Sequence, residues 1–130
     1  MRIEYLLVLC ATSIWPFHVA TAKQHVLRIE CIFDRTASPE GVKKTEHLIP
    51  EYTIDTTTKE AFMVGNAGMS KVIMIEGYLG FTLMEYLPTG AVQTTTIANG
   101  GYAIHSRHTL LSRGSSKPDA VPTQNYGTCR

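Results

Sequence analysis

Residues 90–111 read G-A-V-Q-T-T-T-I-A-N-G-G-Y-A-I-H-S-R-H-T-L-L, and this stretch decides the fold. Two runs rich in β-branched and aromatic residues flank the pair Asn99 and Gly100. An Asn-Gly pair between two such runs is a strong local signal for a β-hairpin. The stretch therefore predicts two antiparallel strands joined by a tight turn.

The form of that turn decides which residues share a face of the hairpin. Counting outward from a two-residue type I′ turn pairs Ile97 with Tyr102 and Thr95 with Ile104. The face with the larger apolar groups, Ile97, Tyr102 and Ile104, is expected in the core. The opposite face then presents a set of polar side chains, namely Thr94, Thr96, His105, Arg107 and Thr109. A slip of one residue, or a longer loop over residues 98–101, would exchange the two faces.

The rest of the sequence predicts further short strands separated by turns. Alternating or β-branched runs occupy residues 26–33, 48–55, 61–64, 71–76, 81–86 and 121–129. Residues 34–45 are polar and contain Pro39 and Gly41, so they predict a loop, with a brief helical turn as an option over residues 41–47. With the hairpin, about eight short strands follow one another at nearly regular spacing. This pattern is typical of an all-β fold, either an antiparallel β-sandwich or a small closed β-barrel.

Length and charge limit the classes of protein to which the chain can belong. It has 130 residues and a formal net charge of +1, and 44% of its residues are hydrophobic. This size fits one domain. The basic residues are scattered, which argues against a nucleic-acid partner and against binding to an anionic membrane.

The first residues predict export. Residues 1–22 contain an apolar run followed by Ala20-Thr21-Ala22, an A-x-A cleavage signal, so they are expected to be a signal peptide. A buried helix or a membrane anchor is the alternative, but Pro16 would break a helix and the apolar run is too short to span a bilayer. Residues 23–130 then form a single β domain, located in the periplasm or secreted.

Cleavage after residue 22 would remove Cys10 and leave Cys31 and Cys129. An even pair in an oxidising compartment predicts a disulfide that joins the first strand to the last. The alternative is two free cysteines too far apart to bond. No metal site is expected, because the chain lacks the clustered cysteine spacing of zinc sites.

No motif in the chain assigns a catalytic residue or a cofactor. His105 and His108 are three residues apart, which puts them on opposite faces of a strand and prevents joint metal binding. Ser106 lacks the G-x-S-x-G turn that exposes a nucleophile. The polar face of Thr94, Thr96, His105 and Arg107 is either a solvated exterior or a binding site. In a binding site, Arg107 would suit a carboxylate or phosphate, and His105 would be a proton-sensitive donor.

Three segments carry a resemblance to a known family. Residues 90–97 (G-A-V-Q-T-T-T-I), 103–110 (A-I-H-S-R-H-T-L) and 124–129 (Q-N-Y-G-T-C) resemble a family of small uncharacterised bacterial exported proteins. That resemblance implies export and a compact β domain, but no activity. At the level of the fold, the chain is also similar to small periplasmic lysozyme inhibitors. Those are disulfide-closed β-barrels with a Tyr-x-Cys final strand, whereas this chain has Tyr126-Gly127-Thr128-Cys129.

The sequence therefore predicts a non-catalytic binding role in the cell envelope. The partner would be an envelope protein or a small ligand, with no nucleic acid and no stable membrane insertion after cleavage. One alternative is an inhibitor of a lysozyme-like or other hydrolase, acting through a loop at residues 112–119 or 65–68. Another alternative is a hydrolase that uses His105 or His108.

Overall fold

The computed structural model describes residues 25–66, 68–111 and 119–130, and this part of the chain consists of strands and turns without a helix. The strands are β1 (Val26–Ser38), β2 (Gly41–Leu48), β3 (Glu51–Asp55), β4 (Ala61–Gly65), β5 (Gly68–Gly77), β6 (Gly80–Tyr86), β7 (Val92–Ala98), β8 (Tyr102–Leu111) and β9 (Asp119–Cys129). Within the described residues, no helix has the length and apolarity needed to cross a membrane.

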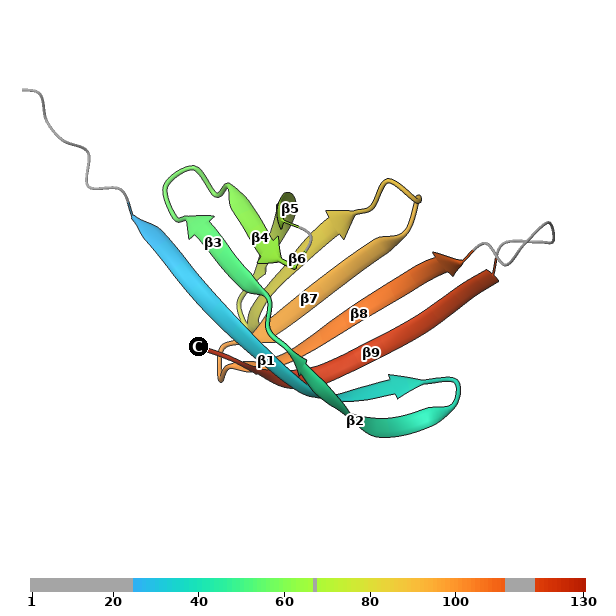
Figure 1. Cartoon of the computed structure of the whole chain (residues 1–130). Coiled ribbons are helices and arrows are strands. Elements are labelled where there is room, and N and C mark those ends of the chain that lie inside the picture. Colours follow the sequence, from blue (N-terminus) through green and yellow to red (C-terminus); the bar gives the residue numbers. More distant parts are fainter. Residues whose placement is uncertain (1–24, 67, 112–118) are drawn as a thin grey trace, which may run out of the picture.

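The strands form one antiparallel sheet that closes on itself. Strands β3 to β9 follow one another in sequence order, and β9 pairs with β1 (Figure 1). The first half of β1 pairs with β3, and its second half pairs with β2. The result is an eight-stranded barrel of β1 and β3–β9, with β2 as an extra strand. The prediction of an all-β fold is confirmed, and of the two architectures offered the closed barrel is the correct one.

Alternation along the strands puts apolar side chains inside the barrel. On β1, Ile29, Cys31 and Phe33 are buried, as the alternating pattern predicts, while Arg28 is exposed. Most of the remaining core is contributed by the other strands, in particular Tyr52, Ile54, Ala61, Val72, Leu83, Ile97 and Ala103.

The predicted disulfide is confirmed. Cys31 and Cys129 are opposite each other in the β1–β9 pairing, and their sulfur atoms are bonded. The bond lies across the closure of the barrel and links residues 98 positions apart in the sequence. In the chain-entropy description, a covalent loop of this length stabilises the fold by roughly 4–5 kcal/mol.

The predicted loop over residues 34–45 is wrong. These residues continue β1 and form most of β2, joined by a turn at Pro39 and Glu40. The signal was missed because β2 does not cover the core: most of its side chains are exposed and polar. A strand exposed in this way shows no apolar alternation, so it resembles a loop in the sequence.

The two-residue turn of the β7–β8 hairpin is wrong; the hairpin has the longer loop that the sequence left open over residues 98–101, and its register differs by one residue. The Gly101 amide donates to the Ala98 carbonyl, and Gly101 has a φ of +84°, whereas Asn99 and Gly100 have no positive φ. Three residues thus connect the strands, in the form of a turn followed by a glycine bulge. Ile97 consequently pairs with Ala103 instead of Tyr102. Tyr102 and Ile104 are on the outside, with exposed fractions of 75% and 42%.

The expected signal peptide at residues 1–22, with Cys10, lies outside the described residues, as do residues 112–118 of the proposed inhibitory loop.

Candidate functional site

The inner wall of β6–β9 changes from apolar to polar along the strands. One row of paired inward positions consists of Phe81, Ile97, Ala103 and Gly127. The next row consists of Leu83, Thr95, His105 and Asn125. The third row consists of Glu85, Gln93, Arg107 and Thr123. The first row lies at the end of the barrel that holds the disulfide, and the third lies at the opposite end.

A cavity of about 540 Å³ occupies the polar end. This volume is in the range of small-molecule sites. Its apolar wall is formed by Leu48, Ile49, Pro50, Met63 and Leu87, and its polar wall by Glu85, Gln93, His105, Arg107 and Asn125. The sheet brings these residues together from β2, β4 and β6–β9 and from the connections β2–β3 and β6–β7. The cavity is therefore amphipathic.

A chain of hydrogen bonds crosses the interior next to the cavity. The Tyr52 hydroxyl on β3 is 2.6 Å from Thr95 Oγ1 on β7, and Thr95 Oγ1 is 2.8 Å from His105 Nδ1 on β8. The His105 ring also packs against Phe33, with 5.8 Å between the ring centroids. These contacts fix the orientation of the imidazole that faces the cavity.

The direction of this chain follows from the tyrosine. Thr95 is the hydrogen-bond partner of the buried Tyr52 hydroxyl, so the tyrosine proton is satisfied when Tyr52 donates to Thr95. Of the described residues, His105 Nδ1 is then the acceptor that remains for the Thr95 hydroxyl proton, so we infer that Thr95 donates to Nδ1 and that Nε2 carries the proton of the neutral ring. No described residue bonds Nε2, so this donor is left for a molecule in the cavity.

Burial controls the charge states of this chain. It lowers the pKa of His105 to about 4, with the nearby Arg107 charge acting in the same direction and Glu85 opposing it. Burial also raises the pKa of Tyr52 to about 12, against the lowering effect of its bond to Thr95. Both groups are therefore neutral at pH 7, and the histidine does not add a positive charge to the cavity.

Two charged side chains face the cavity without forming an ion pair. Glu85 has an exposed fraction of only 7%, and its carboxylate accepts a hydrogen bond from the Gln93 amide. Arg107 lies one strand beyond Gln93 in the same row and is more exposed. Among the described residues, neither Glu85 nor Arg107 belongs to a salt bridge. The glutamine thus separates a carboxylate from a guanidinium.

The four predicted site residues do not share one face. Thr94 and Thr96 point out of the barrel, where Thr96 Oγ1 is 2.9 Å from Thr82 Oγ1. His105 and Arg107 point inward and line the cavity. The cause is the bulge at Gly101, which shifts β8 by one residue relative to β7. Half of the predicted set is therefore at the cavity and half is on the exterior.

Sequence reasoning missed the carboxylate and the two amides of the cavity, which are Glu85, Gln93 and Asn125. A signal was available for Glu85: it continues the inward alternation of Phe81 and Leu83 along β6. Gln93 also follows from alternation, since it shares the face of Ile97 on β7, but its position next to Arg107 depends on the hairpin register. Asn125 is held by Thr36, whose hydroxyl donates to Asn125 Oδ1 at 2.6 Å.

His105 and His108 lie on opposite sides of β8, as their spacing predicts. His105 is buried, whereas His108 is exposed and pairs with Pro122. In the described ranges, no group of three or more histidine, cysteine or acidic side chains is placed to hold a metal ion.

Comparison of the chain with protein-family models, with curated proteins and with solved structures finds no match. The resemblances stated from the sequence therefore stay expectations, and the site has to be interpreted from its own chemistry.

Proposed function

We propose that this protein is an exported, non-catalytic carrier or receptor for a small ligand, which it binds inside the polar end of the barrel. The observation that carries the proposal is the 540 Å³ amphipathic cavity, into which a buried carboxylate, a neutral imidazole and a guanidinium all project. Sites for small molecules combine apolar walls with a few fixed polar groups in this manner.

Rigidity supports a binding role. The Cys31–Cys129 bond links β1 to β9, and three polar groups at the cavity are held by hydrogen bonds: His105 by Thr95, Glu85 by Gln93 and Asn125 by Thr36. A site whose side chains are already fixed loses little conformational entropy when a ligand binds.

Export is supported by the same disulfide, because such bonds persist in oxidising compartments. A hydrolase that uses His105 or His108 is not part of the proposal: His105 lies at the cavity and His108 on the opposite side of β8, so the two imidazoles do not share a site. The proposal therefore contains no catalytic step.

The test compares two substitutions at neighbouring positions of β5. Ser70 lines the cavity, whereas Lys71 points outward, so Ser70→Phe should fill the cavity and Lys71→Phe should leave it open. Native mass spectrometry of protein recovered from the periplasmic fraction should show a bound small molecule in the wild type and in Lys71→Phe, but not in Ser70→Phe. An equal bound mass in both variants would contradict binding in the cavity. Full-length, reduced protein in the cytoplasm would contradict export.

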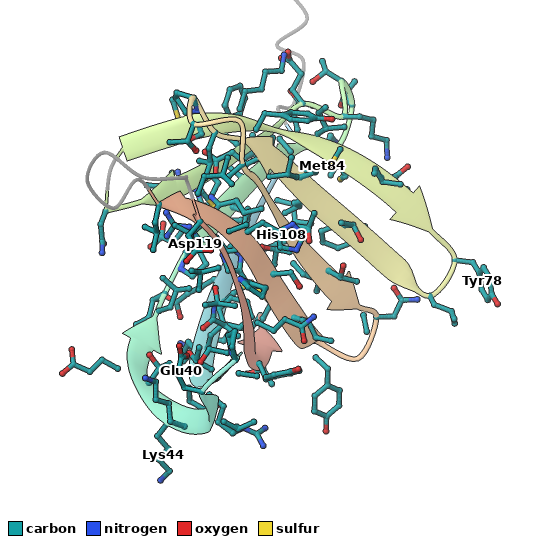
Figure 2. All side chains as sticks on the ribbon, turned by 90° about the vertical axis from the view of Figure 1, so that its right-hand side faces the viewer. Glu40, Lys44, Tyr78, Met84, His108 and Asp119 are labelled. Carbon is teal, nitrogen blue, oxygen red and sulfur yellow. A yellow bond between two sulfur atoms is a disulfide. The ribbon has the colours of Figure 1, made fainter. Side chains whose placement is uncertain are left out.

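A second candidate, inhibition of a lysozyme-like or other hydrolase, is favoured by one observation. Tyr78 and Leu79 form the tip of the β5–β6 hairpin, which protrudes from the barrel (Figure 2). Their exposed fractions are 90% and 68%. Asn99 fixes the tip, because its side chain donates to the Tyr78 carbonyl and its backbone amide donates to the Leu79 carbonyl, each at 2.9 Å.

A rigid tip of this kind could enter the cleft of an enzyme. Lysozyme activity measured with excess protein tests the idea: the wild type should inhibit, and the double variant Tyr78→Ala, Leu79→Ala should not. Full lysozyme activity in the presence of excess wild-type protein would rule out lysozyme as the target.

A further inference from the structure

We propose that the ligand of the cavity is a small zwitterion with an apolar side chain, of the class of a free amino acid or a short peptide. Its ammonium group would bind to Glu85, its carboxylate to Arg107 and His105, and its side chain to the wall of Met63 and Leu87. This inference rests on the proposed ligand-binding function and specifies its ligand.

The Glu85 carboxylate requires a partner. Burial of a charged group is costly unless that group is paired or hydrogen-bonded. Glu85 is 7% exposed, and its bond from the Gln93 amide engages only one of its two oxygens. It lines the cavity, and no described residue supplies a cation to it. A ligand ammonium group would satisfy it by a charge-assisted hydrogen bond.

Arg107 provides the opposite charge in the same cavity. It lies two strands from Glu85 along one row, which puts their Cα atoms about 10 Å apart at the usual strand spacing. Gln93 is between them and is bonded to Glu85. The planar guanidinium offers two parallel donors to a carboxylate. The nearby His105 Nε2–H is a further donor for the same group.

A dipolar ligand fits this pair better than an ion of either sign. A simple cation drawn to Glu85 would be repelled by Arg107, and a simple anion drawn to Arg107 would be repelled by Glu85. A molecule that carries both charges satisfies both groups and is oriented by them. The remaining wall, with Ile49, Met63 and Leu87, then receives an apolar group.

The test uses leucine and three relatives as probes for isothermal titration calorimetry. N-acetylleucine lacks the cation, leucinamide lacks the carboxylate, and leucyl-leucine moves the two charges further apart. We expect leucine or leucyl-leucine to bind, and we expect removal of either charge to weaken binding at least tenfold. Preference for leucine over leucyl-leucine would indicate a free amino acid, and the reverse preference a short peptide.

Charge-removing variants connect the effect to the two residues. Glu85→Gln should abolish the discrimination against N-acetylleucine, and Arg107→Gln the discrimination against leucinamide. Glu51→Gln and Arg28→Gln make the same changes on exposed positions outside the cavity and should retain both preferences. Wild-type protein that binds all probes equally would overturn the inference.

The failure of this inference can be distinguished from the failure of the proposed function. If no probe binds while native mass spectrometry still shows a small molecule that Ser70→Phe excludes, the zwitterion is wrong and the ligand site stands. If no probe binds and no bound mass appears, both the inference and the function are overturned.

Discussion

The two ends of the barrel interior are built by the same strands, yet they contain different chemistry. At the disulfide end, the inward row is Phe81, Ile97, Ala103 and Gly127, and at the other end it is Glu85, Gln93, Arg107 and Thr123. These rows are only four positions apart along each strand. Tight apolar packing supplies stability at the first end, whereas the second end is left hollow and polar. A small barrel can thus keep its stability and its binding site in separate layers.

The largest loss of stability is expected from removal of the disulfide. Replacing both cysteines, with Cys31→Ala and Cys129→Ala, should lower the free energy of unfolding by about 4 kcal/mol, because the unfolded chain regains the freedom of a long loop. Urea unfolding without a reductant measures the loss. Dithiothreitol should produce a similar loss in the wild type and none in the double variant. An unchanged midpoint would show that the barrel closes without the bond.

A pair of substitutions on β6 compares the two ends directly. Leu83→Ala should cost about 3 kcal/mol, since Leu83 is 2% exposed and its truncation leaves a cavity in the core. Glu85→Gln, two residues further toward the hollow end, should change the unfolding free energy by less than about 1 kcal/mol, because an amide can replace the carboxylate as acceptor. Equal losses in urea unfolding would show that the polar end is as important for stability as the core.

The disulfide end of the barrel should not accommodate even one added methyl group. A Cβ on Gly127 would lie 1.9 Å from the Ile32 carbonyl oxygen of β1, so Gly127→Ala must push β1 and β9 apart. We expect a loss of about 2–3 kcal/mol in thermal or urea unfolding. Gly100→Ala is the matched control, because its Cβ would meet nothing nearer than Tyr102 Cδ2 at 3.9 Å. Similar stabilities for the two variants would contradict the close approach of β1 and β9.

The last comparison concerns the pH dependence of stability at His105, which lies between the two ends of the barrel. The pKa of His105 is lowered to about 4 in the folded state, from 6.5 in the unfolded chain. The unfolded state therefore binds the proton more readily, and the stabilising contribution is complete above pH 6.5 and is lost as the pH falls toward 4. Between pH 7 and pH 4.5 the loss from this residue should be about 2 kcal/mol.

Urea unfolding of His105→Gln at the two pH values should show a pH dependence smaller by that amount. The control is His108→Gln, which alters an exposed histidine on the outer side of the same strand and should behave as the wild type. An identical pH dependence in His105→Gln and the wild type would show that the imidazole is not buried.

Sequence patterns were sufficient for the all-β class, and they named two residues that line the cavity, His105 and Arg107. Alternation identified Ile29, Cys31 and Phe33 as core residues, and the cysteine count identified the disulfide. The rest depended on the register of the β7–β8 hairpin, in which Gly101 forms the bulge. Asn99-Gly100 and Gly100-Gly101 are both acceptable turn pairs, and local sequence alone does not choose between a two-residue and a three-residue loop. The choice is made by tertiary packing, since it brings His105 next to Phe33 and Thr95.

The cavity itself could not be predicted, because it is a property of the closed barrel. The β6–β7–β8 pairing brings Glu85 and Arg107 into one row, but Met63 on β4 faces Arg107 on β8 across the cavity only after β1 pairs with β9. A polar residue at an inward position interrupts the apolar alternation of its strand, so the sequence pattern alone does not identify it as part of a site. In this barrel such residues mark the end at which the core stops and the cavity begins.

The extra strand β2 has a consequence for self-association. Closure of the barrel pairs both edges of every other strand over at least part of its length, while β2 pairs only with β1 in the described part of the chain. An open edge invites a strand from another molecule, which is a common start of aggregation. Lys43, Lys44 and Glu46 are exposed on this strand, and the hairpin that carries Glu40 and Lys44 projects from the barrel (Figure 2). Charged side chains on an edge strand oppose the pairing of a further strand, so the charges that make β2 look like a loop also protect a concentrated solution of the protein against templated growth.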